Sequence, residues 1–150
     1  MTERRKYMIV AIGCDHAGYE LKEKVKDKLI ADGYDVIDVG TNSTDPVDYP
    51  IYGHAIGKAV SSGEADRGVA ICGSGIGISI AVNKVPGTRC ALCTSVEMAE
   101  MSRRHNDANV IAMGARMISE ELAFDMIDKW FATEFQGGHH LHRIEILEEL

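Results

Sequence analysis

The strongest constraint on the fold is an alternation of short apolar runs with longer segments of helical periodicity. Five runs read as strands, within residues 6–14, 34–39, 68–72, 89–93 and 109–113. Segments with apolar residues three and four apart follow them, at 17–31, 51–62, 78–82, 95–104 and 119–131. Strands that are buried on both faces read as continuous apolar runs. The alternation therefore predicts a three-layer α/β sandwich with a five-stranded parallel sheet covered by helices on both faces.

Length and composition favour a single domain over residues 1–150. The chain has 150 residues, of which 45% are hydrophobic, and two separate cores of half that size would be marginal. Residues 1–6 read as a short N-terminal extension, because no apolar signal core follows their basic residues. Residues 137–150 form a C-terminal tail that is too polar to fold alone. Its apolar residues recur every three positions, so we expect a helical tail that packs on a partner subunit; they are Leu141, Ile144, Leu147 and Leu150.

Charge and cysteine content exclude several classes of partner. The net charge of −7 argues against a nucleic-acid partner and against an anionic membrane surface. No apolar run approaches the roughly 20 residues that a membrane span requires. Four cysteines without a disulfide-like framework indicate a reducing compartment, so we expect a cytoplasmic protein.

In a parallel α/β sheet, ligands bind beyond the carboxyl ends of the strands. The residues that follow the expected strands are therefore the first candidates for a functional site. They are Cys14-Asp15-His16, Asp48-Tyr49, the segment 72–77, the region around His105, and Arg116.

The segment after the third expected strand is a glycine-rich turn that leads into a helix, with glycines at 73, 75 and 77. Backbone N–H groups at a helix N-terminus favour a bound anion, although a tight packing turn would have the same pattern. A dinucleotide-binding loop is a poorer match, because Ile78 occupies the place of its third glycine. Cys72 opens the loop, where nearby amides favour the thiolate and can hold a developing oxyanion. A base beside such donors is suited to proton abstraction next to a carbonyl.

Four motifs in order resemble the type B ribose-5-phosphate isomerases, which belong to the ribose/galactose isomerase family. The resemblance extends from about residue 8 to 147. Its motifs are Gly13-Cys14-Asp15-His16-Ala17-Gly18, Asp48-Tyr49-Pro50, the segment from Ile71 to Lys84 (ICGSGIGISIAVNK) and the segment from Ser102 to Val110 (SRRHNDANV).

The resemblance implies a Rossmann-like homodimer, sometimes a tetramer, with active sites near the subunit interface. It also implies interconversion of D-ribose 5-phosphate and D-ribulose 5-phosphate through an enediolate, with no metal and no cofactor. An isomerase of galactose 6-phosphate or allose 6-phosphate is the alternative within the same family. A non-catalytic phosphate-binding regulator is a further alternative, but a regulator would not need both Cys72 and His105.

The resemblance assigns roles to individual residues. It makes Cys72 the base, Ser74 a proton carrier between two substrate oxygens, and His105 the acid that opens the sugar ring. The amides of the loop, at Gly73, Gly75, Ile76 and Gly77, would stabilise the enediolate oxygen. The sugar would be held by Asp15 and Tyr49, and the phosphate by His16, Asn106, Arg116, His139 and Arg143.

His139 departs from the family pattern, since many members have arginine at this position. A histidine donates to phosphate most strongly when it is protonated, so we expect a phosphate affinity that depends more on pH. Arg143 is the firmer assignment for the phosphate.

Two other chemistries compete with this interpretation. Cys90 and Cys93 have the spacing of half a zinc site, but residues three apart in a strand face opposite sides. Asp107 could orient His105 in a hydrolase triad, with Ser74 or Cys72 as the nucleophile. The sequence lacks the G-x-S-x-G pattern of a nucleophile elbow, which argues against that class.

Overall fold

The chain folds around a parallel sheet of five strands, whose order is β2-β1-β3-β5-β4. The computed structural model describes residues 8–150. The strands are β1 (Ile9–Cys14), β2 (Asp35–Gly40), β3 (Arg67–Cys72), β4 (Cys90–Leu92) and β5 (Val110–Gly114). Each strand overlaps one of the five predicted runs, and all four strand pairings are parallel, as the sequence predicts.

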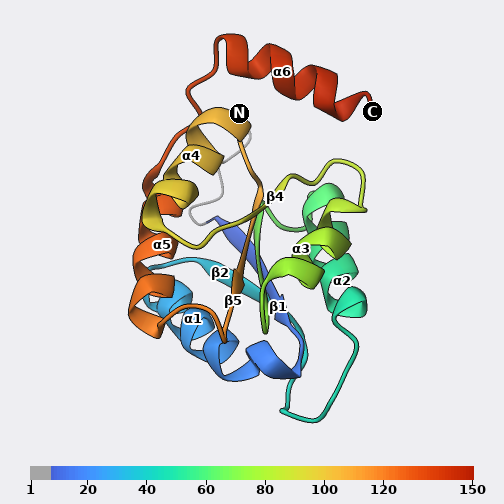
Figure 1. The fold of residues 1–150 in the computed structure, drawn as a ribbon, viewed down its shortest axis with the longest axis vertical. Helices are drawn as coiled ribbons and strands as arrows, with labels where there is room; N and C mark the ends of the chain where they lie inside the picture. The colour runs from blue at the N-terminus through green and yellow to red at the C-terminus, as the bar shows by residue number, and fades with distance from the viewer. Residues whose placement is uncertain (1–7) are drawn as a thin grey trace, which may run out of the picture.

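Helices cover both faces of the sheet, which gives three layers (Figure 1). One face carries α1 (Tyr19–Ala31), which follows the 3-10 turn η1 (His16–Gly18), together with α4 (Val96–Asn106) and α5 (Glu120–Ala132). The other face carries α2 (Tyr49–Ser61) and α3 (Ile76–Asn83). Ser95 caps α4, since its hydroxyl accepts a hydrogen bond from the amide of Met98 at 3.1 Å.

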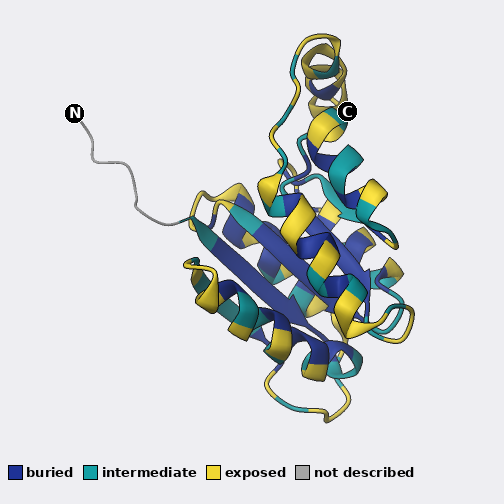
Figure 2. Ribbon diagram, turned by 90° about the vertical axis from the view of Figure 1, so that its left-hand side faces the viewer, coloured by how far each residue is buried: buried dark blue, intermediate teal, exposed yellow. Residues whose placement is uncertain are grey.

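Two apolar clusters fix these layers. Alternate residues of β1 enter different clusters, with Val10 and Ile12 on the α1/α4/α5 side and Ala11 on the α2/α3 side. The first cluster includes the fully buried Trp130 of α5, and the second includes Ile56 of α2. Figure 2 shows the sheet as a buried layer between helices whose outer faces are exposed. Burial of both faces explains why β1 and β5 have no polar side in the sequence.

The last helix, α6 (His139–Glu148), stands apart from the three layers and packs against α4 (Figures 1 and 2). Of the predicted apolar stripe, Ile144 is buried, whereas Leu141 and Leu147 are each 48% exposed and Leu150 is 97% exposed. The tail is therefore helical, as predicted, while its packing on a partner subunit stays a prediction. The predicted N-terminal extension, 1–6, lies outside the described residues. Within residues 8–150, no helix has the length and apolarity to cross a membrane.

Candidate active site

The loop after β3 folds around the sulfur of Cys72. Gly75 has φ +80° and ends the loop, and α3 begins at the next residue. The amide of Gly75 donates a hydrogen bond to Cys72 Sγ at 3.2 Å, and the amide of Ile76 donates to Ser74 Oγ at 3.2 Å. A backbone donor therefore faces the sulfur at the N-terminus of a helix, where negative charge is favoured. The amides of Gly75 and Ile76, both predicted to face a substrate oxygen, are thus engaged within the loop in this structure.

The loop after β5 lies against the glycine loop. The amide of Ala115 donates to the carbonyl of Cys72 at 2.8 Å, and the amide of Arg116 donates to the carbonyl of Gly73 at 2.9 Å. A Cβ on Gly73 would lie 3.2 Å from a terminal nitrogen of Arg116. The guanidinium of Arg116 is therefore held beside the loop, within reach of an anion that binds there.

The loop after β1 brings two more candidates to the same edge of the sheet. Asp15 is buried and caps η1, since its Oδ1 accepts from the amide of Gly18 at 3.1 Å. The amide of Val47 donates to Nδ1 of His16 at 3.1 Å. A ring nitrogen that accepts a hydrogen bond carries no proton, so the proton of His16 lies on Nε2, which can donate to a ligand.

These loops enclose an open cleft of about 410 Å³, which we call the thiol cleft. It brings together eight of the residues predicted from the sequence: Asp15, His16, Tyr49, Cys72, Gly73, Ser74, Gly77 and Arg116. Ala17 and Met117 also line it and were not predicted, because nothing in their type signals a site. Gly75 and Ile76 belong to the loop but do not line the cleft.

A second set of predicted residues lines another pocket, which we call the histidine pocket. This pocket has a volume of about 400 Å³ and is lined by His105, Asn106, His140, Arg143, Ile144 and Leu147. The ring of His105 stacks on that of His140, with centroids 4.4 Å apart and planes at 13°. The ring of His139 lies 4.0 Å from His140 on a tilted plane. His140 was not predicted, because its place depends on how α6 packs on α4.

Partial desolvation holds the pKa of His140 below its ordinary value, and the charges of His139, His105 and Arg143 lower it further. The surroundings of His140 therefore disfavour its protonated form in the free protein. A bound anion would raise the pKa of His140, because it stabilises the protonated ring.

The two pockets lie at opposite edges of the sheet, which corrects the prediction for His105. The first pair of β3 and β5 is Gly68 with Val110, and the last is Cys72 with Gly114. His105 sits in the last turn of α4, before β5 begins, so it lies at the amino edge of the sheet and not at the carboxyl edge. The ends of β5 alone are about 13 Å apart at the usual rise per residue.

The other cysteines are packed thiols. Burial raises the pKa of Cys14 to about 12 and that of Cys93 to about 11, and it also raises the pKa of Cys90. Cys90 packs with the cluster on the α2/α3 face, whereas Cys93 belongs to the cluster on the other face. The two thiols therefore face opposite sides, as the strand spacing predicts. Within residues 8–150, no group of three or more His, Cys, Asp or Glu side chains is arranged to hold a metal ion.

The geometry also argues against the hydrolase triad. Asp107 Oδ1 accepts a hydrogen bond from Arg103 at 2.8 Å, and its other oxygen lies 3.7 Å from Arg89. The carboxylate of Asp107 thus interacts with two arginines that hold the end of α4. The proposed nucleophiles, Ser74 and Cys72, lie at the other edge of the sheet.

The fold and the thiol cleft define a class: a Rossmann-like α/β protein with a thiol, a glycine-rich loop at a helix N-terminus and an arginine at the carboxyl edge of its sheet. The sequence profile of the family described as Ribose/Galactose Isomerase matches residues 10–147. The chain belongs to this family of enzymes.

Individual relatives cover almost the whole chain. Ribose-5-phosphate isomerase B of Escherichia coli (strain K12) is 44% identical over 138 residues, which are 92% of this chain and 93% of the relative. The structure of Clostridium thermocellum ribose-5-phosphate isomerase B has a TM-score of 0.94 at 53% identity, covering 95% of this chain and 96% of that one. The Mycoplasma genitalium ribose-5-phosphate isomerase B, described with bound ribulose-5-phosphate, has a TM-score of 0.92 at 30% identity over 97% of each chain.

Proposed function

We propose that this protein interconverts D-ribose 5-phosphate and D-ribulose 5-phosphate through an enediolate. The observation that carries the proposal is the Cys72 sulfur, which accepts a backbone hydrogen bond inside the glycine loop and lines one cleft with His16 and Arg116. The named activity of the relatives in Escherichia coli and Clostridium thermocellum supports the same reaction.

Proton transfer is assigned to the glycine loop. Cys72 removes the proton from C2 of the open-chain aldose as thiolate, which leaves an enediolate with its negative charge on oxygen. Ser74 carries a proton between O1 and O2, and the thiol of Cys72 returns its proton to C1. The free amides of the loop stabilise the charged oxygen while the intermediate exists. No redox partner is consumed, because the reaction only moves hydrogen within the sugar.

Ring opening is assigned to His105 of a second copy of this chain. In one chain, the thiol cleft and the histidine pocket share no residue and lie at opposite edges of the sheet. A homodimer of the isologous kind would place the histidine pocket of each chain against the thiol cleft of the other, which gives two complete sites. Ile76 and Ile80 on α3, beside the glycine loop, are 54% and 58% exposed and offer apolar surface for such an interface.

Substrate binding then divides between the two chains. Asp15 and Tyr49 contact the sugar from the thiol cleft. The phosphate lies where the pockets meet, between His16 and Arg116 on one side and a set from the partner on the other, namely Asn106, His139 and Arg143. Arginine suits this role because its planar fork matches phosphate oxygens.

The activity is tested with protein that has been treated with a chelator. We expect ribulose 5-phosphate to form from ribose 5-phosphate between pH 6 and 9, and its absence across that range would contradict the proposal. Galactose 6-phosphate and allose 6-phosphate are measured beside it, because the same chemistry on a longer sugar is the competing function. Phosphate binding without any turnover would indicate the regulator instead.

The two-chain site is tested by mixing inactive variants. Cys72→Ala and His105→Ala chains carry different affinity tags, and the mixed dimer is purified through both. If each site takes Cys72 from one chain and His105 from the other, one of the two sites is intact and about half of the wild-type activity returns. If each site lies within one chain, every site carries one substitution and no activity returns.

A further inference from the structure

The position of α6 depends on few contacts, although this helix carries His140 and Arg143 to the histidine pocket. Ile144 is its one buried side chain, and α6 packs against α4 rather than against the sheet. Burial of one side chain gives little resistance to displacement of a ten-residue helix. Besides this packing and the stack of His140 on His105, a further interaction sets the place of α6 relative to His105.

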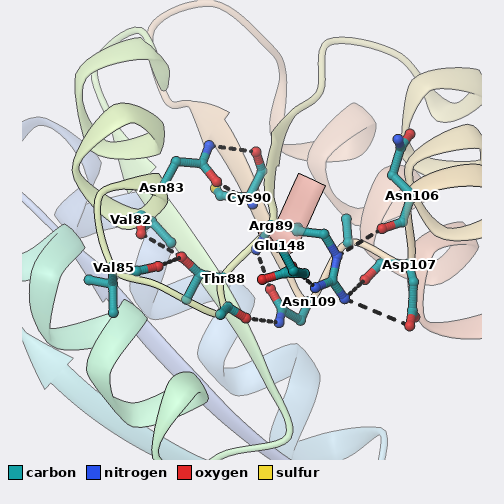
Figure 3. A network of polar contacts seen from close by, with 12 residues as sticks. Val82, Asn83, Val85, Thr88, Arg89, Cys90, Asn106, Asp107, Asn109 and Glu148 are labelled. Carbon is teal, nitrogen blue, oxygen red and sulfur yellow. Dashed lines mark hydrogen bonds and ion pairs between the residues drawn. The ribbon is translucent and has the colours of Figure 1, made fainter. Parts of the chain in front are cut away.

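Arg89, just before β4, provides that interaction (Figure 3). Its Nε donates to the carbonyl of Asn106 at 3.0 Å, and a terminal nitrogen donates to the carbonyl of Asp107 at 2.9 Å. The other terminal nitrogen forms an ion pair with Glu148 in the last turn of α6. One guanidinium thus joins the C-terminal end of α4 to the C-terminal end of α6.

Asn109 fixes the backbone of Arg89. The backbone amide of Arg89 donates to Oδ1 of Asn109 at 2.7 Å, and the side-chain nitrogen Nδ2 of Asn109 donates to the carbonyl of Gly87 at 2.9 Å (Figure 3). Only 17% of the Arg89 side chain is exposed, so its planar group has little freedom to follow a moving helix. The guanidinium therefore acts as a fixed point at the amino edge of the sheet.

We propose that Arg89 and Glu148 are positioning residues. They hold α4 and α6, the two walls of the histidine pocket, in a fixed position relative to each other. The proposal rests on the proposed function, since it assigns these walls to phosphate binding and ring opening. The α4 wall ends at His105 and Asn106, directly beside the carbonyls that Arg89 holds. The α6 wall carries Arg143, five residues or about 7.5 Å along the helix from Glu148. Arg89 and Glu148 line a neighbouring pocket and not the histidine pocket, so they act through these walls.

The test compares Glu148→Gln with Glu149→Gln. Both variants remove one negative charge from adjacent exposed or half-exposed positions, but no ion pair involves Glu149 among residues 8–150. We expect amide hydrogen exchange in α6 to accelerate in Glu148→Gln alone. We also expect its KM for ribose 5-phosphate to rise about fivefold with kcat changed less than twofold, because an ion pair of this exposure has a modest effect. Raising the salt concentration should narrow the difference in KM from wild type, because salt screens the ion pair.

Each result decides the proposal. Unchanged exchange in α6 would overturn it, and so would faster exchange without a rise in KM relative to Glu149→Gln. If wild-type protein shows no isomerase activity, the proposed function fails separately. Binding of inorganic phosphate, followed by NMR at the His140 ring, then replaces KM: weaker binding in Glu148→Gln supports the positioning role, and equal binding rejects it.

Discussion

The ring of Tyr49 lies over Gly77 so closely that a Cβ there would lie 2.6 Å from Tyr49 Cζ. Gly77→Ala must therefore push the tyrosine ring out of the thiol cleft. Tyr49 is already 40% exposed, so the ring can move toward solvent at little cost in stability. We expect kcat/KM to fall about tenfold or more, and the free energy of unfolding to change by about 1 kcal/mol or less. Steady-state kinetics and urea unfolding measure both.

A double-mutant comparison separates this cause from others. In a Tyr49→Ala background, no ring remains to be displaced, so Gly77→Ala should change kcat/KM little further. Equal losses in both backgrounds would contradict the assignment and would point to the loop backbone.

Gly75→Ala should instead damage folding. Gly75 has φ +80°, and a Cβ would lie 2.7 Å from the backbone carbon of Met113 and 2.9 Å from the amide nitrogen of Gly114. Backbone atoms cannot move aside as a ring can, so we expect a loss of about 3 kcal/mol in unfolding free energy. Gly33→Ala is the matched control, because Gly33 has φ +97° with open space around it and should lose only about 1 kcal/mol. A similar loss at both positions would contradict the steric account.

Cys72 should be the first thiol to react with an alkylating reagent. Burial raises the pKa of Cys14 to about 12, so very little thiolate exists there at pH 8, and the pKa values of Cys90 and Cys93 are also raised. Cys72 lines the thiol cleft and accepts a hydrogen bond from the amide of Gly75. Peptide mapping after a short treatment with iodoacetamide identifies the modified residue. Ribulose 5-phosphate should slow the reaction, and preferential modification of Cys14 would contradict the prediction.

The packing of α6 on α4 should weaken in mild acid. The pKa of His140 is lowered in the folded protein, so the displaced helix binds a proton more readily than the docked one. The contribution of His140 to the docking of α6 is complete above the ordinary histidine pKa of about 6.5. It is lost as the pH falls toward the lowered pKa of the docked form. The protection factors of the α6 amides, taken from hydrogen exchange at pH 7.5 and pH 5.5, measure the effect. His140→Gln should remove the difference, and a helix that docks more tightly at the lower pH would refute the prediction.

Local pattern was sufficient to predict the strands, the helices and their three layers. Continuous apolar runs predicted the strands within a few residues. The glycine loop and Asp15 were predicted at the carboxyl edge because each directly follows a strand. His105 was misplaced because a helix of eleven residues, α4, carries the chain back along the sheet before β5. Its position four residues before the expected strand 109–113 was the signal for the amino edge.

Contacts made by α6 could not be predicted in the same way. Whether His140 stacks on His105, and whether Arg89 reaches Glu148, depends on where a surface helix packs and not on any local spacing. The strand order β2-β1-β3-β5-β4 is likewise set by tertiary packing.

The placement of Cys72 and His105 at opposite edges of the sheet has a consequence for inheritance. In a cell that makes equal amounts of two chains, half of the dimers are mixed. If each site takes Cys72 from one chain and His105 from the other, as proposed, an allele that lacks Cys72 alone inactivates one site in each mixed dimer, and total activity falls to about half. An allele that lacks both Cys72 and His105 spoils both sites, and activity falls to about a quarter. The second allele would be dominant over the wild type, although it adds only one substitution to a chain that already lacks Cys72.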